Sequence, residues 1–258
     1  MIFPVHFGRF VVLIAVFAFA YVRTPDARAE ELQVFGVAPV RTTVNALTSA
    51  YAHQSGNKVT PTIVASDIVE QSLAGKKFDV MVLSTPEMDE QQQAGRIQPE
   101  TRARIARVGI GVAMRDGASK PDLSTPEKFR EAMLAAKSIA YRRTNEAHLS
   151  GALAERILAS SGVLEAVRPK IKIMNLRASK EAIAKGEVEF GFYNTSEVES
   201  PGVVLAGPVP APLQLYSTFE AALTTNVAAL QEAKGFLAYI AGPAAKPTWD
   251  KAGFEAVQ

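Results

Sequence analysis

Segments with the pattern of β-strands alternate with amphipathic segments from residue 32 almost to the end of the chain. Leu32–Val37 has the character of a strand and is followed by the apolar stripe of a helix. Phe78–Leu83 is an uninterrupted apolar run, which is typical of a strand buried on both faces. Thr125-Pro126-Glu127 has the cap, proline and acid with which helices begin. The alternation predicts an α/β fold with mixed, mostly parallel sheets flanked by helices.

Two shifts in composition divide this alternation. One lies around residues 104–108 and the other in the proline-rich stretch 207–213. If the chain crosses between two lobes at both places, residues 30–106 and 214–258 form lobe 1 and residues 107–213 form lobe 2. Segment 201–216, rich in Pro and Gly, is then interpreted as a connection between the lobes, and the ligand cleft of such a fold is expected between them.

The first 29 residues have the layout of a secretory signal peptide. Arg9 precedes the apolar run Phe10–Val22, and Ala27-Arg28-Ala29 supplies the small residues of a cleavage site. The run would rise only about 20 Å as a helix, which is short of the roughly 30 Å hydrocarbon core of a bilayer. We therefore expect cleavage after Ala29 and an exported protein.

Removal of residues 1–29 leaves 25 basic and 25 acidic residues, so the mature chain is close to neutral. This balance gives no reason to expect a nucleic-acid partner or an anionic membrane surface. The chain has no cysteine, and His53 and His148 lack a second histidine or carboxylate at the spacing of metal ligands. No nucleophile elbow or phosphate-binding glycine loop is present. No metal, cofactor or enzymatic activity is predicted.

A short break between a strand and a helix that starts with Ser or Thr recurs along the chain. Ser66, Ser150, Ser179 and Asn226 are interpreted as helix caps, and Gly36–Pro39 forms a similar break. Each helix start directs free backbone N–H groups and about half a positive charge forward. If several starts face one cleft, they form an anion site without charged side chains.

Several stretches resemble the periplasmic molybdate-binding proteins of bacterial ABC importers. They are LQVFGVAPV, SDIVEQSLAGKKFDVMVLSTPEMDEQQQAGRI, AIAKGEVEFGFYNTSEV and FLAYIAGPAAKPTWDKAGF. The most specific matches are Gln71, Gly75 and Asp79 at the spacing of the family, and Gly186, Glu187 and Gly191. The resemblance covers nearly all of the mature chain. It implies a divergent type 2 periplasmic binding protein, in which Asp79 serves packing and lobe geometry more than ligand contact.

The resemblance also implies where a ligand would bind. It implies ligand contacts at Val37, Ala38, Pro39, Ser66, Ser150, Gly151, Ala178 and Asn194. The second serine of the family falls on Ala65, and the adjacent Ser66 could substitute for it. Pro39 stands where the molybdate binders have a serine, and a proline has neither a hydroxyl nor an N–H group. Asn194 stands where they have a tyrosine. Arg142 and Arg143, just ahead of Ser150, could hold a small carboxylate through paired hydrogen bonds.

These observations predict a solute-binding receptor that delivers a small anion to an inner-membrane ABC permease. The ligand stays open between molybdate or tungstate and a small carboxylate or other anion. A periplasmic sensor that presents its ligand to a signalling receptor is the first alternative. An enzyme on the same scaffold is the second, and it would place a titratable residue with a shifted pKa in the cleft.

Overall fold

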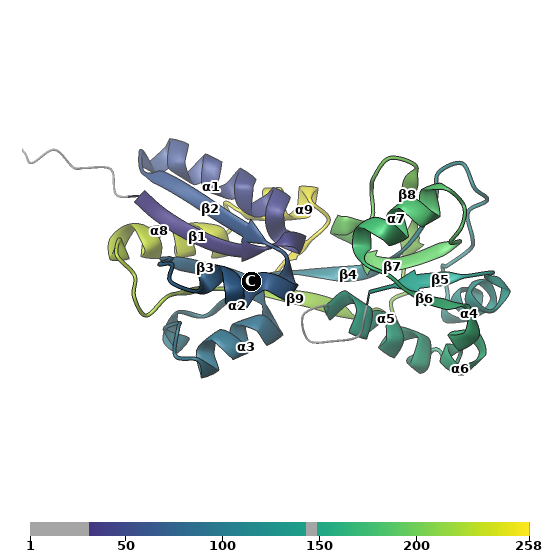
Figure 1. The fold of residues 1–258 in the computed structure, drawn as a ribbon. Helices are drawn as coiled ribbons and strands as arrows, with labels where there is room; N and C mark the ends of the chain where they lie inside the picture. The colour runs from purple at the N-terminus through teal and green to yellow at the C-terminus, as the bar shows by residue number, and fades with distance from the viewer. Residues whose placement is uncertain (1–30, 143–148, 258) are drawn as a thin grey trace, which may run out of the picture.

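The computed structural model describes residues 31–142 and 149–257 (Figure 1). The predicted signal peptide, its cleavage point after Ala29, Arg143 and His148 lie outside the described residues. Within the described ranges, no helix is both long enough and apolar enough to cross a membrane. The fold consists of two α/β lobes joined by strands, which confirms the predicted fold class.

Lobe 1 is built on strands in the order β2-β1-β3-β9-β4. Strands β2, β1 and β3 are parallel, whereas β9 is antiparallel to both β3 and β4. Its strands are β1 (Glu31–Val37), β2 (Lys58–Val64), β3 (Val80–Ser84), β9 (Tyr216–Leu223), the first half of β4 (Ala103–Arg115) and β10 (Glu255–Ala256), which pairs with β4. Its helices are α1 (Arg41–Ser55), α2 (Val69–Leu73), α3 (Thr85–Gln93), α8 (Leu230–Ala241) and α9 (Lys246–Lys251), with the short 3-10 helices η1 (Ala38–Val40), η2 (Ser66–Ile68) and η3 (Pro99–Thr101).

Lobe 2 repeats this plan with different strands. The second half of β4 pairs with β7 and β8 in antiparallel fashion, and β7, β5 and β6 are parallel. Its further strands are β5 (Ile139–Tyr141), β6 (Ile171–Ile173), β7 (Phe190–Asn194) and β8 (Val203–Pro208). Its helices are α4 (Pro126–Ala135), α5 (Leu149–Ser160), α6 (Leu164–Val167) and α7 (Leu176–Ala184), with η4 (Arg168–Lys170) and η5 (Thr195–Glu197).

Each lobe has its own hydrophobic core. Phe35 and Trp249 are buried in the core of lobe 1, while Phe129 and Phe192 are buried in that of lobe 2 and meet edge to face. Burial of each such ring contributes about 2 kcal/mol or more to folding. A smaller cluster beneath α7 adds to lobe 2. Because these clusters are separate, the lobes are joined mainly through β4 and the segment that leads into β9 (Figure 1).

Strand β4 changes partners in the middle of its length. It pairs with β9 as far as Gly109 opposite Tyr216, and with β7 from Ile110 opposite Asn194. At this change the Gln214 side chain accepts a hydrogen bond from Ile110 N at 2.8 Å and donates one to Ile110 O at 3.0 Å. Gly109 leaves room for that amide, since a Cβ there would lie 2.9 Å from Gln214 Nε2. The domain boundaries at 106/107 and 213/214 stay a prediction.

The structure corrects several predicted local features. Segment 201–216 contains β8, which pairs with β4, so it is not only a connection between lobes. Ser150 and Ser179 lie inside α5 and α7, and Asn175 caps α7 by accepting a hydrogen bond from Ala178 N. Ser66 begins η2 and makes no capping hydrogen bond there. Helix α8 begins at Leu230, after Ala229, and not at Asn226. The predicted cap at Thr125 is confirmed.

Asp79 fixes the geometry of lobe 1. Its side chain is buried, Oδ2 accepts a hydrogen bond from Gln33 N at 2.8 Å, and Oδ1 accepts one from Ala228 N at 2.7 Å. Ala229 N donates to the same Oδ1 at 3.4 Å. The carboxylate therefore joins β1 to the chain just before α8 and satisfies N–H groups that Asn226 was expected to serve. The role in lobe geometry that the resemblance implied matches these contacts.

We expect Asp79→Asn to lower the free energy of unfolding by about 3 kcal/mol, because the amide NH₂ would face backbone donors in a buried place. Urea denaturation at neutral pH measures this loss. Glu199→Gln is the matched control, since it removes an exposed carboxylate and should change stability by less than about 0.5 kcal/mol. Equal stability of the two variants would contradict the role of Asp79.

Candidate functional site

A small cavity lies where the two lobes face each other. From lobe 1, its lining includes residues that follow β1, β2 and β3: Pro39, Ser66, Ser84 and Glu87. From lobe 2, it includes residues that follow β5, begin α5 or end β7: Arg142, Leu149, Ser150 and Asn194. Ser217 and Phe219 of β9 complete it. The carboxyl ends of the parallel strands of both lobes therefore point at one place, which is where α/β folds bind ligands.

The cavity has a volume of about 20 Å³. That is room for about one water molecule, and it is too small for a tetrahedral oxyanion or a carboxylic acid. A ligand therefore requires the lobes to move apart, and β4 and the segment before β9 are the only places in the described chain where both lobes are covalently continuous.

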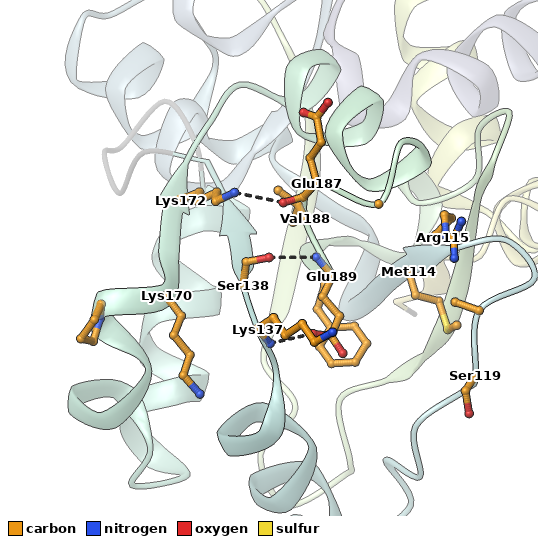
Figure 2. A pocket seen from close by; sticks show the side chains of 14 residues that line it. Met114, Arg115, Ser119, Lys137, Ser138, Lys170, Lys172, Glu187, Val188 and Glu189 are labelled. Carbon is orange, nitrogen blue, oxygen red and sulfur yellow. Dashed lines mark hydrogen bonds between the residues drawn. The ribbon is translucent and has the colours of Figure 1, made fainter.

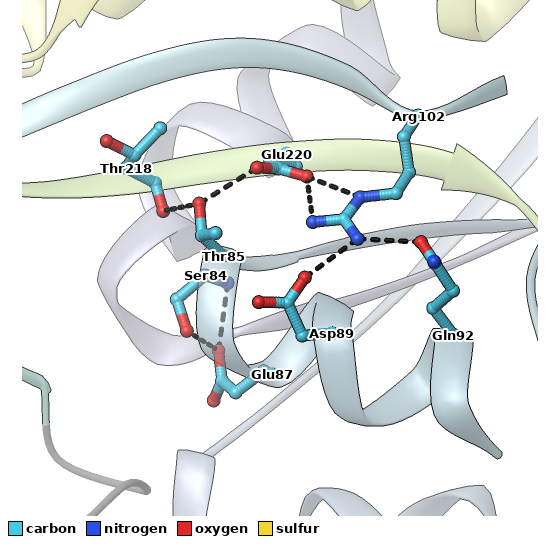
Figure 3. Close-up of polar contacts among 8 residues, drawn as sticks. All are labelled: Ser84, Thr85, Glu87, Asp89, Gln92, Arg102, Thr218 and Glu220. Carbon is cyan, nitrogen blue, oxygen red and sulfur yellow. Dashed lines mark hydrogen bonds and ion pairs between the residues drawn. The ribbon is translucent and has the colours of Figure 1, made fainter. Parts of the chain in front are cut away.

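The wall from lobe 1 carries a buried carboxylate at the start of α3. Ser84, the last residue of β3, donates hydrogen bonds from its backbone N at 2.9 Å and its Oγ at 2.5 Å to Glu87 Oε2 (Figure 3). This is the Ser-x-x-Glu arrangement in which a carboxylate closes the first turn of a helix. The other oxygen, Glu87 Oε1, is buried and has no hydrogen-bond partner among the described residues.

A second polar network holds this turn against β9. Arg102 Nη2 lies 2.6 Å from Glu220 Oε2, and Arg102 Nη1 lies 2.8 Å from Asp89 Oδ1 (Figure 3). Thr85 Oγ1 donates to Glu220 Oε1 at 2.9 Å. Glu220 and the Arg102 side chain are largely buried, so these charges are paired away from solvent. The network fixes the start of α3, and with it the direction of the Glu87 carboxylate.

The wall from lobe 2 carries an arginine next to a second buried carboxylate. The Arg142 side chain is 15% exposed, and its Nη1 lies 3.9 Å from Glu197 Oε1. Asn194 Nδ2 donates to Glu197 Oε2 at 2.8 Å, and Asn194 Oδ1 accepts from Ser217 Oγ at 2.9 Å. At 3.9 Å the ion pair is longer than a hydrogen bond. Arg142 therefore keeps donors that can turn to an anionic ligand.

Burial raises the pKa of Glu197 above its usual value, although Arg142 and Asn194 act in the opposite direction. Burial likewise raises the pKa of neighbouring Tyr193 to about 12, so its hydroxyl stays protonated and donates to Ser179 Oγ. Burial lowers the pKa of Lys180, which faces Glu197 from α7. Glu197, a titratable group with a raised pKa, contacts the lining residue Asn194 but does not itself line the cavity, where the enzyme alternative would place such a group.

The structure brings some of the predicted site residues to the cavity and leaves others away from it. Its lining contains these predicted residues: Pro39, Ser66, Ser150, Asn194 and Arg142. Val37 and Ala38 precede the lining residue Pro39, and Gly151 follows the lining residue Ser150, but these three residues do not line the cavity themselves. Ala178 does not line it either, and its N–H group is occupied by Asn175 Oδ1 at 2.8 Å. These residues stay predictions as ligand contacts.

Sequence reasoning missed Ser84, Glu87, Leu149, Ser217 and Phe219. The first two had a signal: Ser84 and Glu87 form a capping-box spacing directly after a fully buried strand, at the end where ligands bind. Ser217 and Phe219 had none, because β9 enters the cavity only through its pairing with β3 and β4. Among the described residues, no group of three or more metal-ligating side chains is found.

A larger cavity of about 600 Å³ lies within lobe 2, at the opposite ends of its parallel strands (Figure 2). It is lined by residues that precede β5, β6 and β7, including Ser138, Lys170 and Glu189. Its polar groups mostly satisfy one another: Lys172 Nζ donates to Glu187 O, Lys137 N to Glu189 Oε2, and Glu189 N to Ser138 Oγ. Since the amino ends of strands are not the ligand side of an α/β sheet, its size alone does not make it the site.

The chain is similar to known proteins over nearly its whole described length. The profile of the bacterial extracellular solute-binding protein family matches residues 32–255. The chain belongs to this family. In structure it is similar to a Clostridium difficile chain described as the substrate-binding domain of a molybdenum ABC transporter, with a TM-score of 0.73, 14% identity and coverage of 88% of this chain and 99% of the other. This family membership confirms the resemblance found in the sequence.

Two further proteins are similar to this chain. The periplasmic molybdate-binding protein of Azotobacter vinelandii superimposes with a TM-score of 0.67 at 18% identity, covering 88% of this chain and all of the other, 100%. The aconitate isomerase of a Pseudomonas species is 25% identical over 181 residues, which are 69% of this chain and 68% of that protein. The chain is thus similar to proteins of two kinds, one named as a binding protein and one named as an enzyme.

The raised pKa of Glu197 makes stability depend on pH. The folded state binds the Glu197 proton more tightly than the unfolded state does. The contribution of Glu197 to the free energy of unfolding is therefore fully present below its usual pKa, near 4.5. This contribution is lost as pH rises through the raised pKa of the folded state. We expect Glu197→Gln to remove that loss. Urea unfolding from pH 4 to pH 8 should show the variant gaining stability relative to wild type as pH rises, and a difference that stays constant with pH would contradict this.

Proposed function

We propose that the protein is a periplasmic receptor of an ABC importer that binds a small carboxylate between its two lobes. The observation that carries this proposal is Arg142, a largely buried arginine on the wall of the interlobe cavity, whose Nη1 lies 3.9 Å from Oε1 of Glu197. A guanidinium offers two parallel N–H donors that match the two oxygens of a carboxylate. Serine hydroxyls from both lobes supply further donors.

Molybdate is the weaker candidate for this site. Pro39 lines the cavity and supplies neither a hydroxyl nor an N–H group. Of the other predicted donors, Ala178 N already bonds to Asn175. A tetrahedral oxyanion bound by hydroxyls and backbone N–H groups would thus lack one donor in lobe 1, at Pro39, and one in lobe 2, at Ala178. A planar carboxylate facing Arg142 would not depend on these two donors.

Ligand trapping follows from the placement of the two walls. Glu87 and Ser84 belong to lobe 1, whereas Arg142 and Asn194 belong to lobe 2. A ligand that contacts both walls stabilises the closed arrangement relative to the open one. The size of this effect is set by the difference between the ligand's affinities for the closed and the open arrangement. Closed receptors are what a permease in the inner membrane would receive. Cleavage after Ala29 and a monomeric state are part of this proposal, and presentation of the ligand to a sensor instead of a permease is its alternative.

A thermal-shift screen of the mature protein against small carboxylates, molybdate, tungstate and sulfate tests the proposal. A ligand at 100 times its dissociation constant adds about 2.7 kcal/mol, which corresponds to roughly 5–10 °C in Tm for a protein of this size. We expect such a shift from a carboxylate, and we expect Arg142→Gln to weaken that ligand about 10- to 100-fold. Arg177→Gln is the control, because Arg177 is 91% exposed on α7.

The outcomes separate the ligand classes. A shift with molybdate and none with carboxylates would contradict the carboxylate proposal while keeping a receptor. Equal carboxylate affinity in Arg142→Gln and wild type would remove Arg142 from the site. No shift with any anion would contradict the anion receptor as a whole.

The similarity to an aconitate isomerase favours one second candidate, an isomerase acting on an unsaturated polycarboxylate. A buried carboxylate oxygen on the cavity, Glu87 Oε1, is the kind of group that such chemistry needs. It would take a proton from the CH₂ next to the double bond; the double bond then shifts by one carbon, and the proton returns to the former alkene carbon. One proton leaves and one enters, so no redox partner is required.

Incubating the mature protein with cis- or trans-aconitate in D₂O, followed by proton NMR, tests this candidate. An isomerase would interconvert the isomers and incorporate deuterium into carbon, and Glu87→Gln would abolish both. A receptor would leave both isomers unchanged, whether or not it binds them. The second candidate is wrong if neither interconversion nor exchange exceeds the rate without protein.

A further inference from the structure

One oxygen of Glu87 has a structural role and the other has none. Oε2 accepts both hydrogen bonds from Ser84 and so completes the first turn of α3. Oε1 is buried without a donor among the described residues, in a side chain of a residue that is only 5% exposed. Capping α3 requires only the first oxygen. The second oxygen is therefore an acceptor that the fold itself does not use.

Glu87, the residue that carries this acceptor, lines the interlobe cavity. A buried carboxylate oxygen without a donor is unfavourable. A ligand that donates a hydrogen bond to this oxygen would therefore bind more favourably than one that does not. A group with only lone pairs, such as an oxygen of a fully deprotonated oxyanion, would instead be repelled by the carboxylate. Glu87 thus rejects one class of anion while the opposite wall attracts anions.

We propose that the selected ligand carries a hydrogen-bond donor for Glu87 Oε1 as well as an anionic group for Arg142. This inference rests on the proposed anion-binding function and narrows its substrate class. The chemistry is that of a hydroxycarboxylate or of an anion that keeps an acid proton. Because Glu87 stands on lobe 1 and Arg142 on lobe 2, such a ligand contacts both lobes through different ends.

Matched ligand pairs test the inference. Isothermal titration at pH 7 compares malate with succinate, citrate with propane-1,2,3-tricarboxylate, and hydrogen phosphate with sulfate. In the first two pairs the members differ by one hydroxyl, and in the third by one acid proton. We expect wild type to prefer the donor-bearing member of at least one pair by tenfold or more, equal to about 1.4 kcal/mol. The first two pairs report a hydroxyl donor, and the third reports an acid proton.

Glu87→Gln assigns that preference to its residue. The glutamine carbonyl can still accept from Ser84, but its NH₂ then replaces the free acceptor with a donor. We expect the preference to fall below threefold or to reverse, while Glu199→Gln keeps it. Circular dichroism and urea unfolding of both variants verify that they are folded.

Each result decides something different. If anions bind but wild type does not distinguish the members of any pair, this inference is wrong and the proposed anion receptor stands. This result needs wild type alone, so it holds even if Glu87→Gln does not fold. If the preference persists in folded Glu87→Gln, another residue accepts the hydrogen bond and the inference is wrong. If no member of any pair binds, the proposed receptor function fails, and the inference fails with it.

Discussion

The sharing of β4 between both sheets is the constraint on which the rest of the structure depends. One strand pairs with β9 in lobe 1 and with β7 in lobe 2, and the change occurs between Gly109 and Ile110. The two cores are separate, so a twist at this point moves one lobe relative to the other without opening either core. The Gln214 amide adds side-chain hydrogen bonds to Ile110 at this point, beside the backbone hydrogen bonds from Ile110 N to Leu215 O and from Val209 N to Ile110 O.

This arrangement explains why the cavity combines opposite chemistries. Lobe 1 contributes an acceptor, Glu87, whose direction is fixed by Ser84 and by the Arg102 network behind it. Lobe 2 contributes a cation, Arg142, beside the buried Glu197. In the closed state that we propose, a ligand would have to satisfy both walls, and the unpaired carboxylate oxygen would disfavour anions without a hydrogen-bond donor.

Much of the fold could be predicted from the sequence, because apolar periodicity and proline positions are local signals. The strand predicted at 32–37 and the cap at Thr125 are examples. Caps supplied from a distance were not predictable: Asp79 serves the N–H groups before α8, so Asn226 was a false signal. Strand pairing was equally difficult to predict. Segment 201–216 was predicted to be a connection but contains β8, which pairs with β4, and Ser217 of β9 was not predicted to line the site. Glu87 was visible as the acid of a helix start, but only the structure reveals that its second oxygen is left without a donor.

The central claim is that a small carboxylate binds between Arg142 of one lobe and the Ser84–Glu87 turn of the other. A crystal structure of the mature protein grown with a hydroxycarboxylate such as malate or citrate tests it most directly. The account predicts the ligand in the interlobe cavity, with its carboxylate on the Arg142 guanidinium and its hydroxyl within hydrogen-bond distance of Glu87 Oε1. A ligand bound to one lobe alone, or in the larger cavity at the opposite ends of the lobe 2 strands, would contradict it.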